Sequence, residues 1–270
     1  MRFPTRRSRA SRPAAARLLG LLAALWLWLP GAAAAMGCFP SAAMPPGLVP
    51  VALAEGASVE LTFLGHSTFL IESRGGTRAV TDYNAYIRSP VTPEIVTMNN
   101  FHDTHYTDFV EPGVRHILRG WNPAGGPAEH DVTVNDLRVR NVPTAVHGRI
   151  GDQALGNSIF VFETPDLCIA HLGHLHHLLL DAQLGEIGQI DVLLVPIDGS
   201  YTMSQQEMAQ VIDQIGPAVV VPMHYFGGYR LAQFLELMRP RWEVVMSETP
   251  KLTLSRATLP WRQIIVLPGA

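Results

Sequence analysis

The second half of the chain alternates between apolar runs and a helical pattern. Residues 192–195 (Val-Leu-Leu-Val) and 219–221 (Val-Val-Val) are uninterrupted apolar runs, as expected for strands that are buried on both faces. The stretch 204–215 between them has a helical pattern, and Ser204 followed by Glu207 is typical of a helix-capping box. Buried strands separated by a helix indicate a layered α/β domain rather than an all-β sandwich.

The predicted folded domain covers residues 58–270 and starts with short runs of β-type residues. A hydrophobic content of 47% is enough for one large domain or two small ones. Gly75-Gly76 is a candidate hairpin turn between two of the predicted strands. The remaining predicted strands are residues 59–64, 68–71, 78–81, 136–140, 158–162 and 263–267.

Residues 1–37 have the order of a secretory signal. Six arginines precede the apolar run 18–29, and small residues follow at 32–35. Pro30 and Gly31 interrupt the apolar run, which favours an export signal over the alternative, an uncleaved membrane anchor. We therefore expect a periplasmic or extracellular protein.

A stretch rich in Pro, Ala and Gly follows the signal, and we interpret residues 38–57 as a flexible leader. Six of the 20 basic side chains and none of the 23 acidic ones lie in residues 1–37, so the rest of the chain has a net charge of about −9. This charge argues against nucleic acid as a partner. Cys38 and Cys168 permit at most one disulfide, and Cys38 after Gly37 also permits a lipoprotein-type membrane tether.

The eleven histidines are the main candidates for chemistry, because neutral imidazole is the commonest metal ligand in proteins. His224 is the clearest case, since it directly follows the apolar run 219–223. We interpret His66, His116 and His130 as structural or exposed side chains. The histidines near predicted strand ends, where loops gather side chains into sites, are His102, His105, His147, His171, His174, His176, His177 and His224.

Three segments resemble a known family. They are residues 63–72 (Phe-Leu-Gly-His-Ser-Thr-Phe-Leu-Ile-Glu), Thr81-Asp82 and residues 221–225 (Val-Pro-Met-His-Tyr). They are similar to hydrolases of the metallo-β-lactamase fold, and most similar to ascorbate-6-phosphate lactonase and related Zn-dependent hydrolases. The resemblance covers about Val59 to Tyr225. It implies a four-layer αββα sandwich, an α/β fold with metal held by loops along one edge of the two sheets.

The metal motif of that family, H-x-H-x-D-H followed by a His, an Asp and a last His, is altered here. Residues 100–105 read Asn-Phe-His-Asp-Thr-His, so Asn100 has the place of the first His and Thr104 that of the Asp. In the segment Ala-His-Leu-Gly-His, His174 has the place of the Asp that bridges two metals. The ligand set that the resemblance implies is His102, His105, His147, His174 and His224.

Losing both motif carboxylates changes the expected metal site. Imidazole ligands suit one metal ion better than a carboxylate-bridged pair, and we expect one Zn ion, with Fe, Ni or Cu as alternatives. Asp103 and Asp198 are candidates for a general base or further ligand. The resemblance implies that Asp82 orients a ligand histidine by a hydrogen bond. The parts taken by Asn100, Thr104 and His171 stay open.

The function that follows is a metal-dependent hydrolase of a small-molecule ester, lactone or phosphodiester, in which the metal activates water. Two alternatives stay open. The altered motif is also expected of a non-hydrolytic member that keeps the fold for metal or partner binding. Redox chemistry with Fe or Cu is the third reading, and metal analysis with a substrate panel distinguishes them.

Overall fold

The computed structural model describes Cys38 and residues 58–100, 102–146 and 153–269. The chain divides into two units, Met1–Ala35 and Met36–Ala270, and every described residue belongs to the second unit. The expected export signal and residues 39–57 of the expected leader lie outside the described residues. In the described part of the chain, no helix is long and apolar enough to cross a membrane.

The smaller sheet is mixed and has the strand order β13-β1-β2-β3-β4-β5, in which β1 to β5 come from the N-terminal half of the second unit and β13 from its C-terminal half. β1 pairs antiparallel with β2, and β2 pairs antiparallel with β3. The predicted Gly75-Gly76 turn connects β2 to β3. β3, β4 and β5 run parallel. The bounds are β1 Val59–Gly65, β2 Thr68–Ser73, β3 Arg78–Val80, β4 Ile95–Met98, β5 His116–Arg119 and β13 Lys251–Leu254.

The second sheet has the order β12-β14-β11-β10-β9-β8-β7-β6. The five neighbouring strands β12, β14, β11, β10 and β9 run parallel to one another. β6, β7 and β8 form an antiparallel meander, and β8 pairs antiparallel with β9. The bounds are β6 Asp131–Val134, β7 Leu137–Val146, β8 Gln153–Glu163, β9 Cys168–His171, β10 Val192–Pro196, β11 Val219–Met223, β12 Glu243–Met246 and β14 Gln263–Val266.

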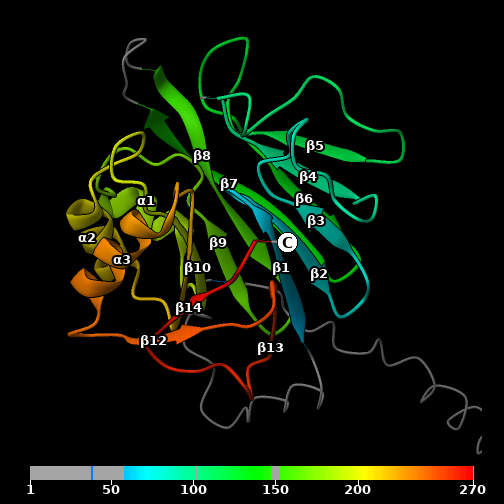
Figure 1. The fold of residues 1–270 in the computed structure, drawn as a ribbon. Coiled ribbons are helices and arrows are strands. Elements are labelled where there is room, and N and C mark those ends of the chain that lie inside the picture. Colours follow the sequence, from blue (N-terminus) through cyan, green and yellow to red (C-terminus); the bar gives the residue numbers. More distant parts are fainter. Residues whose placement is uncertain (1–37, 39–57, 101, 147–152, 270) are drawn as a thin grey trace, which may run out of the picture. The chain divides into compact units, whose positions relative to one another are not determined.

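The helices are α1 Asp181–Ile187, α2 Gln205–Ile215 and α3 Gly228–Met238, and Figure 1 shows them together beside β9 and β10. Buried strand β10 sends alternate side chains to two cores, because successive residues of a strand point to opposite faces. Val192 and Leu194 pack between the two sheets. Leu193 and Val195 pack in the core that contains Ile212 of α2. The apolar run therefore fills two layers at once.

The expected fold class is confirmed, with two facing sheets and a helical layer on the larger sheet. The outer face of the smaller sheet differs in detail. Among the described residues, it is covered by loop side chains such as Tyr106 and Trp121 rather than by a helix. The predicted helix start is also confirmed, because the Ser204 hydroxyl accepts the Glu207 N–H while the Glu207 carboxylate accepts the Ser204 N–H.

A disulfide joins Cys38 to Cys168 at the start of β9, with the two Cα atoms 5.7 Å apart. The Cys38 side chain is buried in the core beneath the helices, and the Cys38 carbonyl accepts the Gln189 N–H at 2.6 Å. The single bridge that the sequence permits is therefore present. It fastens the start of the expected leader to the larger sheet across 130 positions of sequence.

Candidate metal centre

The candidate site lies where strands of both sheets end. Parallel strands bring their carboxyl ends to the same edge, so the residues after β3 and β4 meet on one sheet and those after β9, β10 and β11 meet on the other. β1 runs in the same direction as β3, because both are antiparallel to β2 between them. The turn after β1 therefore opens at the same edge.

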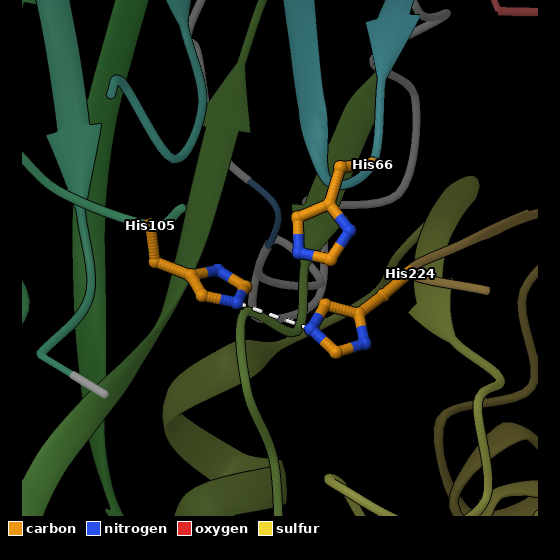
Figure 2. A group of neighbouring side chains, drawn as sticks. All are labelled: His66, His105 and His224. Carbon is orange, nitrogen blue, oxygen red and sulfur yellow. Dashed lines mark hydrogen bonds between the residues drawn. The ribbon is translucent and has the colours of Figure 1, made fainter. Parts of the chain in front are cut away.

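Three imidazoles meet there: His66 from the turn after β1, His105 from the loop after β4, and His224 directly after β11. One nitrogen of each ring lies within 4.8 Å of a nitrogen of the other two. Figure 2 shows the three rings turned toward one another, with the Nε2 atoms of His105 and His224 separated by 3.1 Å. This separation suits nitrogens that share one small cation.

A carboxylate fixes the far nitrogen of two of these rings. His105 Nδ1 lies 2.6 Å from Asp82 Oδ2, and His224 Nδ1 lies 3.0 Å from Asp198 Oδ1. An ionised carboxylate only accepts hydrogen bonds, so both Nδ1 atoms carry the proton. With the proton on Nδ1, the two Nε2 atoms direct their lone pairs at each other, which is repulsive unless a proton or a metal ion lies between them. The donor set therefore fits a metal ion.

Asp82 is fully buried at the end of β3. Its second oxygen, Oδ1, accepts a hydrogen bond from the Asn99 side-chain amide at 3.2 Å, and His171 Nε2 lies 3.9 Å from Oδ2. Burial by itself raises the pKa of this carboxyl, but electrostatic interaction with His105 and His171 and the hydrogen bond from His105 outweigh burial and bring the pKa to about 2. Asp82 is therefore ionised at neutral pH.

Asp198, in the loop after β10, is buried. Oδ2 accepts the backbone N–H groups of Ser200 and Thr202, while Oδ1 accepts the Thr202 hydroxyl at 2.6 Å besides His224. Burial raises the pKa of Asp198, but the hydrogen bond from His224 and those from Thr202 and Ser200 lower it well below its usual range. Its position behind His224 suits holding that ring rather than acting on a substrate.

His66 completes the group with a nitrogen held away from water. Its Nε2 atom is buried and has no hydrogen-bond partner among the residues that the structure describes. Burial, together with the charges of His224 and His105, lowers the pKa of His66 to about 3. Burying a polar atom without a partner costs free energy, and a bound metal ion would supply that partner. A neutral imidazole with a buried lone pair is therefore suited to bind a metal ion.

The backbone at the site is strained. His66, Asp82 and His224 have positive φ angles of 52°, 43° and 54°, a region that side chains other than glycine rarely occupy. Such conformations cost on the order of 1–3 kcal/mol each and cluster at functional sites. Three of them around one group of imidazoles indicate that the fold is arranged to hold these side chains in position.

Two further predicted ligands adjoin the three rings. The ring centre of His174 lies 5.0 Å from those of His105 and His224, and the ring centre of His102 lies 5.2 Å from that of His174. His174 also shares a 2.6 Å hydrogen bond with the half-buried His176. His171 is differently used, because its Nε2 donates to a backbone carbonyl at 2.8 Å while its Nδ1 accepts a backbone N–H.

The other predicted residues are not members of the group of three rings, and one of them lies outside the described residues. Asp103 is exposed and accepts a hydrogen bond from the Tyr86 hydroxyl. Thr104, beside it, is half-buried and lines a pocket together with Asp103, His66 and His224. The Asn100 N–H donates to the Gly156 carbonyl at 3.2 Å. His147 lies outside the described residues.

Sequence reasoning missed His66, which we had interpreted as structural or exposed. The signal was present, because His66 follows the apolar strand 59–64 through a single glycine, just as His224 follows its own apolar strand. The family motif instead predicted ligands in the loop after β4. The structure brings His105 and His224 together with His66, and sets His102 and His174 at their border.

A pocket of about 470 Å³ opens over the imidazoles. This volume is within the range of small-molecule sites, roughly 300–1,000 Å³. The described residues that line it are His66, His102, Asp103, Thr104, Tyr201, His224 and Phe226.

Residues 60–224 match a family model described as the beta-lactamase superfamily domain. Among curated proteins, the chain is 29% identical to a UPF0173 metal-dependent hydrolase of Caldivirga maquilingensis, across 61% of this chain and 81% of that protein. It is 27% identical to a UPF0173 metal-dependent hydrolase of Thermococcus kodakarensis, across 70% of this chain and 96% of that protein.

Solved structures agree with this match. A protein of Thermotoga maritima, provisionally described as a Zn-dependent hydrolase of the metallo-beta-lactamase superfamily, superposes with a TM-score of 0.59 at 29% identity. The match covers 78% of this chain and all of that protein. A metallo hydrolase of Ignicoccus hospitalis superposes with a TM-score of 0.52 at 18% identity, across 79% of this chain and 97% of that protein. This similarity supports the fold alone.

Proposed function

This chain belongs to the beta-lactamase superfamily, and on that basis we propose that it is a metal-dependent hydrolase of a small-molecule substrate with an imidazole-rich site for one metal ion. The observation that carries the proposal is the pair of Nε2 atoms 3.1 Å apart, on rings whose far nitrogens are each fixed by a carboxylate. The relatives named metal-dependent hydrolases support it.

In this proposal His66, His105 and His224 hold the ion, with His102 and His174 at the border of the site. Imidazole donors suit Zn, and Fe, Ni and Cu are the alternatives. A bound metal ion supplies Lewis acidity that polarises a carbonyl or phosphoryl oxygen and makes water more nucleophilic.

The protein's own contribution is to hold protons and to orient rings. Asp82 and Asp198 keep the protons of His105 and His224 on Nδ1, which leaves the Nε2 lone pairs to bind the ion. Asp103 at the pocket rim is a candidate to accept a proton during attack on an ester, lactone or phosphodiester bond. The alternative is a member that binds metal without hydrolysis.

The test begins with the metal content of the purified domain and continues with hydrolysis of matched ester, lactone and phosphodiester substrates. We expect about one equivalent of metal, and we expect His66→Ala and His224→Ala each to lower both metal content and activity. His116→Ala is the control, because His116 lies at the start of β5, away from the strand ends that form the site. Metal without hydrolysis favours the binding alternative, and activity unchanged in both variants refutes the proposal.

We also propose that the protein is exported. The order of charges and apolar residues in 1–37 and the Cys38–Cys168 disulfide support this, because disulfides persist in oxidising compartments. A disulfide and a lipid thioether need the same Cys38 sulfur, so the two exclude each other. Thiol alkylation followed by mass spectrometry of the exported form tests this: labelling of both cysteines only after reduction is expected, and a lipid mass on Cys38 contradicts it.

A further inference from the structure

Two aromatic side chains form the entrance to the metal centre. Tyr201 and Phe226 both line the pocket and are 54% and 61% exposed. Their ring centres lie 5.9 Å apart and nearly perpendicular, at 70°. The ring centre of Phe226 is 5.5 Å from that of His66, and the ring centre of Tyr201 is 5.8 Å from that of His102. A molecule that reaches the imidazoles therefore lies against these rings.

The charge of the pocket does not suit an anion. No Lys or Arg lines it among the described residues, whereas the exposed carboxylate of Asp103 does. Asp82 and Asp198 add two carboxylates directly behind the imidazoles, and their charges offset that of a divalent ion held there. Sites that act on phosphoryl groups usually offer Arg or Lys side chains to the phosphate oxygens. A phosphodiester would instead approach the centre past a negative charge.

From this arrangement we propose that the pocket selects an uncharged carboxylic ester or lactone that carries an aromatic or aliphatic group, and disfavours phosphodiesters and phosphorylated sugars. The inference rests on the proposed hydrolase function and narrows its substrate class. The apolar group packs on Phe226 and Tyr201, which leave water on binding. The carbonyl then faces the three imidazoles beneath them.

The reaction is a hydrolysis without change of oxidation state. The oxygen of water forms a bond to the acyl carbon, and the bond from that carbon to the alkoxy oxygen breaks. One proton of the water goes to the departing alkoxide, and the other is released from the new carboxylic acid to solvent. No reactant other than water and the ester or lactone is needed.

Binding and turnover are measured separately. Calorimetric titration of the metal-loaded protein compares N-phenylbutanamide, an uncharged amide analogue of a phenyl ester, with diphenyl phosphate, an anionic phosphodiester with the same ring. We expect the amide to bind about tenfold more tightly or better. Phe226→Ala and Tyr201→Ala should each weaken its binding about tenfold, because each removes one wall of the apolar pocket. Trp261→Ala, at an aromatic residue that is 73% exposed outside the pocket lining, is the matched control.

Asp103→Asn tests the charge argument, and we expect diphenyl phosphate to bind about threefold more tightly to this variant. Metal content measured on every variant separates loss of metal from loss of contact. Equal or tighter binding of diphenyl phosphate to the unmodified protein overturns the inference, as does unchanged amide binding in both aromatic variants. Absence of hydrolysis with 4-nitrophenyl butanoate and with bis(4-nitrophenyl) phosphate overturns the proposed function instead, and leaves the binding comparison valid.

Discussion

Replacing Asp82 by asparagine changes one atom of the carboxylate and tests how the proposed metal centre is held. Asp82 accepts a hydrogen bond from His105 Nδ1 on one oxygen and one from the Asn99 amide on the other. Asn99 cannot turn its amide around, because its own oxygen accepts the backbone N–H of Ser158 at 2.8 Å. An asparagine side chain has only one oxygen, so Asp82→Asn leaves one of the two donors facing an N–H group.

The expected cost follows from which donor loses its acceptor. A buried donor left without an acceptor costs roughly 1–3 kcal/mol in the free energy of unfolding. If the new amide turns its nitrogen toward His105, that ring moves its proton to Nε2, and the lone pair beside His224 is lost. Removing an outer partner of a ligand histidine typically weakens metal binding 10- to 100-fold, which corresponds to roughly 1.4–2.7 kcal/mol.

Two measurements check this expectation. Denaturant unfolding of the metal-free protein gives the stability change, and competition with a chromophoric chelator gives the zinc affinity. Asp166→Asn is the control, because Asp166 is also a buried carboxylate and accepts the N–H of Arg256. Asp166 lies just before β9, at the end of that strand opposite to the site. Zinc affinity of Asp82→Asn within twofold of the unmodified protein would show that this carboxylate does not set the state of His105, and the reasoning would fail.

Two further predictions concern the scaffold. Cys38→Ser should lower the free energy of unfolding by about 2–5 kcal/mol, because the lost bridge spans 130 positions of sequence. A reducing agent should lower Tm of the unmodified protein and leave that of the variant unchanged. Equal Tm values for the variant and the unmodified protein without reducing agent would contradict this. Gly173→Ala should cost roughly 1–3 kcal/mol by overpacking, because Gly173 has a φ of 58° and an added Cβ would overlap the side-chain amides of Asn157 and Asn99. Zinc affinity should fall as well, since Asn99 donates a hydrogen bond to Asp82. A variant with a lower Tm but an unchanged zinc affinity would be evidence against that coupling.

Local patterns in the sequence were enough to predict the layered fold. Uninterrupted apolar runs became the doubly buried strands β10 and β11, and the Ser204 capping box begins α2. The short helix α1 and the helix α3 were not predicted, because neither has a side-chain cap of the kind that marks α2: the N-cap residues are Leu180 and Gly227. Helix starts without polar caps leave little signal in a sequence.

The candidate site divides in the same way. Sequence alone singled out histidines after apolar strands and the absence of the two motif carboxylates, since both are visible in the order of residues along the chain. Only the tertiary structure decided that His66 joins His105 and His224, that Asp198 is buried behind His224, and that His171 is bound to backbone. The reason is geometric: which side chains share a few ångströms depends on strand direction and on backbone angles at the strand ends. Residues as far apart in the chain as His105 and His224, 119 positions, carry no mark of that proximity in the sequence.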